Sequence, residues 1–118
     1  MRRIISSGSV KGFLIDREMV MEKLKDVSEM ALNIFPEILE IRVFGSFAKG
    51  EETGLSDIDI LILISSSDEK NPVERLKKYF YFFSENVDIA VDVIVVDLSE
   101  INNFKDIISS SVLITKRN

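Results

Sequence analysis

Two short polar groups in the middle of the chain have residue types and spacing suited to phosphate and metal chemistry. Ten residues separate the pair Gly45-Ser46 from Asp57, Asp59 follows two positions later, and the apolar run 60–64 comes next. A glycine turn lets backbone N–H groups approach a phosphate closely, and a serine hydroxyl can donate a further hydrogen bond. Carboxylates bind divalent cations through oxygen. Together these residues indicate a site for a metal-bound nucleoside triphosphate.

The two aspartates are expected to act as a pair. Asp57 and Asp59 lie two residues apart on a predicted strand, so both side chains leave the same face of that strand. Carboxylates so close repel each other unless a cation lies between them. The alternative is that both face water at a frayed strand start. The Gly45-Ser46 turn just upstream favours the metal site.

A third carboxylate is a candidate for the same site. Asp92 lies in the apolar segment 87–96, where an unpaired buried carboxylate would cost several kcal/mol. That cost disappears if Asp92 reaches the end of the sheet and binds metal. The alternatives are an ion pair with Lys or Arg, or solvation near an edge. Asp88 and Asp97 are interpreted as ordinary strand-end acids.

Residues around the turn could assist. Lys49 could contact phosphate, although a solvated lysine is the more common outcome, and Ser56 could cap or brace the loop. Gly50 and Gly54 let the chain double back between turn and strand. A second Gly-Ser pair, at positions 8 and 9, is interpreted as linker.

Composition narrows the chemistry further. The chain has 118 residues, a net charge of −5, and neither Cys nor His. Thiol chemistry, imidazole catalysis and typical zinc sites are therefore excluded, and any metal must sit on oxygen ligands, which favours Mg²⁺ or Mn²⁺. The acidic balance argues against strong direct nucleic-acid binding. No apolar run approaches the roughly 18 residues of a membrane span, and no signal sequence is evident, so we expect a cytoplasmic protein.

Helical and strand patterns alternate, which predicts an α/β layer architecture in one domain over residues 16–118. Residues 1–15 are expected to form an arm or a short edge strand. Asp16 is a plausible N-cap of a first helix that Pro36 ends. The predicted strands cover residues 39–44, 57–64, 89–96 and 112–115. The third of these is apolar on both faces and is expected to be central in its sheet.

Two further helices are expected. Asn71 should cap a helix with Pro72 at its first position, and its core stripe is predicted to be Val73, Leu76, Phe80 and Phe83. Ser99 is expected to cap a last helix carrying Ile101, Phe104 and Ile108.

The run Tyr79 to Phe83 supplies five of the ten aromatic residues. Successive helical residues turn by about 100°, so five in a row cannot all face one sheet. Tyr81 and Phe82 are expected to point away from the stripe. They either pack against a neighbouring helix or the N-terminal arm, or form a partner or homo-oligomer interface.

The segment from Gly45 to Gly50, followed five residues later by Ser56 to Asp59, resembles the signature of the polymerase-β-like nucleotidyltransferases, and most closely that of their minimal nucleotidyltransferase branch. The resemblance covers roughly residues 16 to 116. It implies a small mixed β-sheet backed by helices. Position 47 departs from the pattern, because Phe47 stands where many members have Arg and a possible phosphate contact is lost. Lys49 would be a partial substitute.

The resemblance also implies roles and partners. Gly45 and Ser46 would bind the triphosphate of ATP, Asp57 and Asp59 would hold two Mg²⁺ ions, and Asp92 would complete the metal site and help activate the attacking hydroxyl. Members of this branch act as antitoxins of HEPN-type helical proteins, and some transfer AMP to a tyrosine of that partner.

Three functions stay open at this point. The first is an enzyme that adenylylates a partner protein, which retention of all three aspartates favours. The second is a non-catalytic binding module that neutralises a helical partner, which Phe47 favours slightly. The third is a nucleotidyltransferase subunit that acts on a small molecule.

Overall fold

The computed structural model describes the backbone of residues 2–7, 10–15, 17–50 and 57–118, and the side chains of the last two ranges. The predicted roles of Asp16, Gly54 and Ser56 and of the linker at 8 and 9 lie outside the described residues. The elements are β1 (Arg2–Ser7), β2 (Val10–Ile15), α1 (Arg17–Ile34), β3 (Ile38–Phe44), α2 (Gly45–Lys49), β4 (Ile58–Ile64), α3 (Pro72–Asn86), β5 (Val91–Asp97), the 3₁₀ helix η1 (Leu98–Phe104), α4 (Lys105–Ser110) and β6 (Val112–Lys116).

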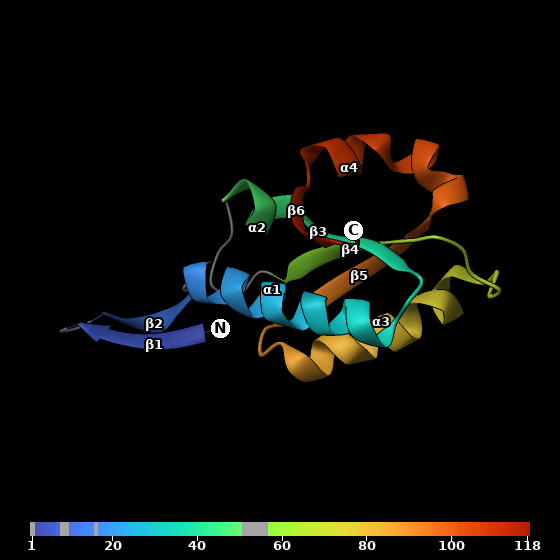
Figure 1. Cartoon of the computed structure of the whole chain (residues 1–118). Helices are drawn as coiled ribbons and strands as arrows, with labels where there is room; N and C mark the ends of the chain where they lie inside the picture. The colour runs from blue at the N-terminus through green and yellow to red at the C-terminus, as the bar shows by residue number, and fades with distance from the viewer. Residues whose placement is uncertain (1, 8–9, 16, 51–56) are drawn as a thin grey trace.

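A four-stranded mixed sheet with the order β5-β4-β3-β6 forms the centre of the fold. β3 runs antiparallel to both β4 and β6, whereas β4 and β5 are parallel. Helices α1 and α3 cover one face, and η1 and α4 cover the other (Figure 1). The expected α/β fold with a small mixed sheet backed by helices is confirmed.

Strand β4 is buried on both faces, and this orients the residues at its start. Ile58, Ile60, Ile62 and Ile64 join the core beneath α1 and α3, whereas Leu61 and Leu63 pack on the opposite side with η1 and α4. Because side chains alternate along a strand, Asp59 shares the second side with Leu61.

The expectation that the Asp92 strand is central in its sheet is wrong. β5 is an edge strand, paired only with β4 among the described strands. It is apolar on both faces because Val91, Val93 and Val95 pack in the core with α3, while Val96 packs on the opposite side. Helices that cover both faces of an edge strand produce the same apolar pattern as a central position.

Helix α3 begins as the sequence predicts but presents a different stripe. The Asn71 side chain accepts hydrogen bonds from the N–H groups of Val73 and Glu74, and Pro72 is the first helical residue. Val73, expected in the core, is 61% exposed in the first turn, whereas Tyr79 is fully buried with Phe83. Tyr79 is tolerated there because its hydroxyl donates to the Glu37 carboxylate.

Replacing Asn71 with Ala should lower the free energy of unfolding by about 1 kcal/mol, because two N–H groups at the start of α3 lose their acceptor. Urea unfolding would measure the loss. Asn71→Asp should retain most of the stability, since an aspartate can accept the same bonds; an equal loss in both variants would contradict the capping role.

The aromatic run is divided between the core and the surface. Phe82 packs edge-on against Phe35, with ring centroids 5.6 Å apart, and Phe80 is half-buried. Tyr81 remains 57% exposed. Phe82 therefore packs within the chain, and an oligomer interface at this run stays a prediction that would rest mainly on Tyr81.

The C-terminal helical segment starts two residues earlier than expected. Asp97, not Ser99, caps η1: its carboxylate accepts a hydrogen bond from the Ser99 N–H, and the Glu100 side chain accepts one from the Asp97 N–H. The prediction for Ser99 is therefore wrong, and Asp97 is more than an ordinary strand-end acid. A reciprocal pair of this kind satisfies two helix-start donors, which one serine cannot do. Ile101, Phe104 and Ile108 pack on the sheet as expected.

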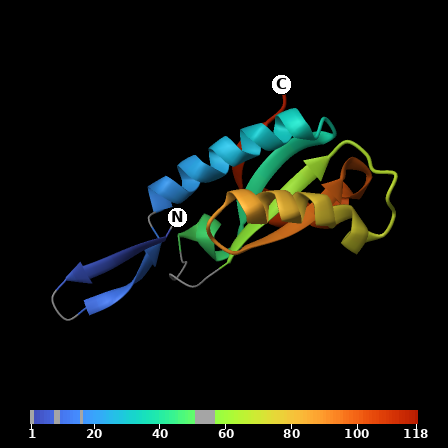
Figure 2. The same ribbon diagram turned by 90° about the horizontal axis from the view of Figure 1, so that it is seen from below.

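The N-terminal strands β1 and β2 form an antiparallel hairpin that projects from the body (Figures 1 and 2). The hairpin does not add an edge strand to the four-stranded sheet. Its assignment as an arm separate from the domain stays a prediction. In the part of the chain that the structure describes, no helix is long and apolar enough to cross a membrane.

Candidate active site

Strand pairing brings the predicted site residues to one end of the sheet. Asp59 of β4 is in register with Asp92 of β5 on one side and with Phe44 of β3 on the other. Gly45 follows Phe44 directly, and Asp57 directly precedes β4. Asp57, Asp59 and Asp92 all belong to the side of the sheet that carries η1 and α4, because their neighbours Ile58 and Val91 belong to the opposite core. Three segments far apart in sequence therefore meet at this sheet end.

Gly45 lies against the Asp59 carboxylate. Its φ of +74° is a left-handed conformation that favours glycine, and a Cβ placed on it would stand 2.2 Å from Oδ2 of Asp59. Helix α2 starts at Gly45, and the residue before it provides no side-chain cap for the first N–H groups. The turn thus combines a close approach to Asp59 with backbone donors suited to an anion.

Like charges are concentrated at this sheet end. Burial raises the pKa of the Asp59 carboxyl, and the nearby charges of Asp92 and Asp57 raise that pKa further. Within the described ranges none of the three aspartates forms an ion pair, so the alternative of a Lys or Arg partner for Asp92 is wrong for this part of the chain. Such unpaired acids are the electrostatic arrangement that a cation would stabilise.

Asp92 is not buried, contrary to the prediction. Asp92 is exposed on the edge strand β5, and so is Asp57 before β4, while Asp59 is half-buried. Burial therefore gives no reason to expect a ligand at Asp92. Its surroundings are those of the alternative prediction, solvation near the edge of the sheet. Its register with Asp59 is the observation that places it in the site.

Comparison with known proteins identifies the family. Residues 20–117 match the family described as "Nucleotidyltransferase domain". The chain belongs to this family. A search of curated proteins found no match. A solved structure from Sulfolobus solfataricus, provisionally named a nucleotidyltransferase, is 33% identical with a TM-score of 0.64, and the alignment covers 86% of this chain and 84% of that one.

Two toxin–antitoxin structures share the fold of this nucleotidyltransferase. One, solved with AMP-PNP, is 18% identical with a TM-score of 0.52. The other is a MntA–HpeT mutant in which two aspartates two positions apart are replaced by glutamate; it is 16% identical with a TM-score of 0.51. Each alignment covers 88% of this chain and 76% of the other. At these identities the likeness concerns the fold alone.

The three aspartates fit the metal chemistry of a nucleotidyltransferase in donor type. In the described part of the chain no three acidic side chains already converge as in a formed metal site. Asp57, Asp59 and Asp92 nevertheless offer only oxygen donors, as Mg²⁺ and Mn²⁺ prefer. Asp57 and Asp92 are exposed, so a cation from solvent can reach their carboxylates.

The remaining predicted phosphate ligands differ in position. Ser46 is half-buried in the first turn of α2, next to Gly45. Lys49 is exposed in the last turn of the same helix, which is compatible with either a phosphate contact or a solvated side chain. Ser56 lies outside the described residues. The nucleotide-binding roles of these residues stay predictions.

Phe47 lies in the core rather than at the phosphate turn. The residue is 1% exposed and belongs to the core on the side of the sheet that α1 and α3 cover. The guanidinium of Arg17 lies over the Phe47 ring, 4.6 Å from its centroid, and also donates a hydrogen bond to the Phe47 carbonyl oxygen. Arg17 was not predicted to make this contact, because no local pattern indicates a contact between residues 30 positions apart.

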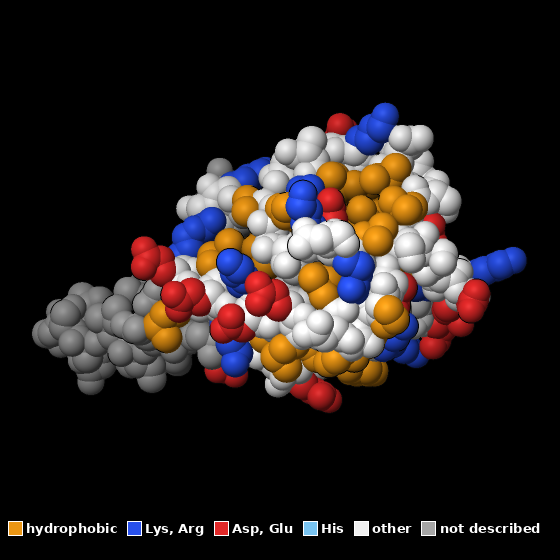
Figure 3. Space-filling view, in the orientation of Figure 1, with side chains coloured by type: hydrophobic (Ala, Val, Ile, Leu, Met, Phe, Trp, Pro, Cys, Tyr) orange, Lys and Arg blue, Asp and Glu red, His pale blue; other side chains and the backbone are white. Residues whose placement is uncertain are grey.

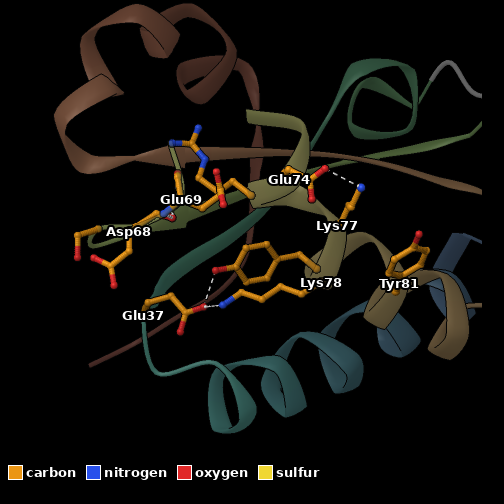
Figure 4. A pocket seen from close by; sticks show the side chains of 11 residues that line it. Glu37, Asp68, Glu69, Glu74, Lys77, Lys78 and Tyr81 are labelled. Atoms are coloured by element: carbon orange, nitrogen blue, oxygen red, sulfur yellow. Dashed lines mark hydrogen bonds and ion pairs between the residues drawn. The ribbon is translucent and has the colours of Figure 1, made fainter. Parts of the chain in front are cut away.

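One cavity among the described residues does not belong to this site. It measures about 680 Å³ and is lined by residues that follow β4 and by the first half of α3, including Ser66, Asp68 and Lys77 (Figure 4). Asp57 and Asp59 stand at the opposite end of β4. Lys78 and Tyr79 both reach Glu37 at the cavity wall and tie α3 to the turn before β3.

Proposed function

We propose that this nucleotidyltransferase transfers a nucleoside monophosphate, AMP from ATP, to a hydroxyl group of a partner protein. The observation that supports the proposal is that Asp59 is in register with Asp92 and that Gly45 lies directly against the Asp59 carboxylate. An acceptor hydroxyl would attack the α-phosphate in line, so that an O–P bond forms and the bond to pyrophosphate breaks.

Each site residue has a proposed task. Backbone N–H groups at Gly45 and the Ser46 hydroxyl bind the triphosphate, and Lys49 adds a positive charge. Asp57 and Asp59 would hold two Mg²⁺ ions, with Asp92 completing the set, and the ions would supply charge stabilisation for the transfer. Asp92 accepts the proton of the acceptor hydroxyl. Catalysis then depends on positioning and electrostatics, which suits a chain without His or Cys.

The nature of the acceptor is inferred from the relatives and the surface. The toxin–antitoxin structures, one of them with AMP-PNP, support ATP as donor and a protein as partner; we propose a HEPN-type helical toxin. Lys and Arg are interspersed with Asp and Glu over the face in Figure 3, and that face has no continuous basic patch in its described part. A protein acceptor fits such a surface better than a nucleic acid does.

The deciding experiment is incubation with α-labelled ATP and Mg²⁺, with and without the gene-adjacent or co-purifying protein. We expect label on the partner, and expect Asp57→Ala/Asp59→Ala to abolish it. Asp88→Ala is a matched control, because Asp88 is an exposed acid that precedes β5 but lies outside the register with Asp59; labelling should be unchanged. A stable complex with an intact, unmodified partner but no label would favour the binding module. Label on small hydroxyl compounds without any partner would favour the small-molecule enzyme.

A further inference from the structure

Arg17 connects helix α1 to helix α2. It is the first residue of α1, and its guanidinium contacts both the carbonyl oxygen and the ring of Phe47 in α2. A cation at a helix N-terminus is unfavourable for that helix, because the N-terminal end already carries partial positive charge. The contacts with Phe47 in α2 offset this cost.

Helix α2 depends on such outside support. It has only five residues and no side-chain cap at its start, and one short helical turn is barely stable by itself. The Phe47 carbonyl lies in its last turn, where it also accepts a hydrogen bond from the Gly50 N–H at 3.2 Å. A guanidinium at this end is favourable, because carbonyl groups at a helix C-terminus carry partial negative charge.

The position of α2 determines the geometry of the candidate site. Gly45 is its first residue, and the space between Gly45 and the Asp59 carboxylate is too small for a Cβ. A small rotation of α2 about its buried Phe47 ring would move Gly45 and Ser46 relative to Asp59. Binding sites of this kind lose much of their effect when groups shift by about 1 Å.

We propose that Arg17 is a positioning residue, which holds α2 from its last turn so that Gly45 and Ser46 stay in place beside Asp59 to receive the triphosphate. The inference rests on the proposed function for its effect on nucleotide binding. Its structural part, that Arg17 limits the motion of α2, does not depend on turnover.

The test compares Arg17→Met, Arg17→Lys and Arg117→Met with the natural protein. Methionine keeps an unbranched apolar side chain but removes the donors and the charge, whereas lysine restores a charged donor. Arg117 is the matched control, because it donates to the carbonyls of Ile38, Leu32 and Phe35 at the other end of α1. Two readouts are needed: hydrogen exchange of residues 45–50 at sub-second labelling times, and the KM and kcat for ATP.

We expect Arg17→Met to speed exchange at residues 45–50 but not at 58–64, and to raise the KM for ATP about ten-fold with kcat changed by about two-fold or less. Arg17→Lys should recover part of both losses. Arg117→Met should lower the melting temperature without either effect. Unchanged exchange at residues 45–50 in Arg17→Met, or an equal KM rise in Arg117→Met, would overturn the proposal. A natural protein without transferase activity would refute the proposed function, and the exchange data would still decide whether Arg17 holds α2.

Discussion

Replacing Asp59 with Asn is expected to reduce nucleotidyl transfer by about a thousand-fold or more and to make the folded protein more resistant to heat at neutral pH. The loss of activity follows from the loss of a charged metal ligand in the centre of the site. The gain in stability follows from the removal of one of three like charges that lie close together without an ion-pair partner in the described part of the chain.

The stability of the fold should decrease as Asp59 ionises. The pKa of Asp59 is higher in the folded protein than in the unfolded chain, because of burial and of the neighbouring charges of Asp92 and Asp57. The folded state therefore holds the Asp59 proton more tightly, so ionisation of Asp59 weakens the fold. Its unfavourable contribution is present at neutral pH and disappears as the pH falls through the raised folded-state pKa. Asp59→Asn should lack this dependence.

Melting curves with and without Mg²⁺, recorded from neutral to acidic pH, would check both statements. Mg²⁺ should raise the melting temperature of the natural protein more than that of Asp59→Asn, because the variant has lost a ligand. Asp106→Asn, at an exposed acid on α4, is the control and should leave transfer and the Mg²⁺ response unchanged. An Asp59→Asn protein that melts at a lower temperature than the natural one at neutral pH and without Mg²⁺ would contradict the electrostatic argument.

Gly45→Ala is expected to lower activity by about a hundred-fold and to destabilise the fold by several kcal/mol. The backbone at Gly45 has φ +74°, where a side chain costs about 1–2 kcal/mol. The new Cβ would also stand 2.2 Å from Oδ2 of Asp59, so the carboxylate or helix α2 must move. Displacement costs of this kind add about 1–3 kcal/mol, and the shift separates the phosphate turn from the metal ligands.

The chain contains a matched control for this prediction. Gly50 has nearly the same backbone angle, φ +73°, but a Cβ built on it meets nothing within 4 Å. Gly50→Ala should therefore show only the backbone cost in urea unfolding and should keep most of its activity. If the two variants lose the same stability and activity, steric conflict with Asp59 is not important. Gly45→Ala should also be less harmful to stability in an Asp59→Ala background, because the truncated side chain leaves room for the methyl group.

Several features could be predicted from the sequence because they depend on neighbouring residues. Asn71 caps α3 because Asn-Pro at a helix start satisfies local donors, and Gly45 opens α2 because a tight turn after a strand requires a positive φ. Asp57 and Asp59 are two apart at the start of a strand, so period-two alternation alone places them on one face. The segment from Gly45 to Asp59 resembles the nucleotidyltransferase signature, and residues 20–117 match that family.

Other features depended on packing partners that local periodicity does not contain. Tyr79 rather than Val73 is buried because Glu37, 42 positions away, accepts its hydroxyl hydrogen bond. β5 looks like a central strand but lies at the edge, because helices cover both of its faces. The contact of Arg17 with Phe47 likewise joins two elements 30 residues apart.

The amino-acid sequence by itself determined which residue types are available for the site: a glycine-serine turn, a pair of aspartates on one strand face, and oxygen ligands only. It also showed the resemblance to a known family. Only the tertiary structure decided that Asp92 is in register with Asp59, and that Gly45 lies directly against the Asp59 carboxylate. The physical reason is that strand order and register are set by hydrogen bonds and core packing between distant segments. Residue spacing specifies which face a side chain takes, but not which strand becomes its neighbour.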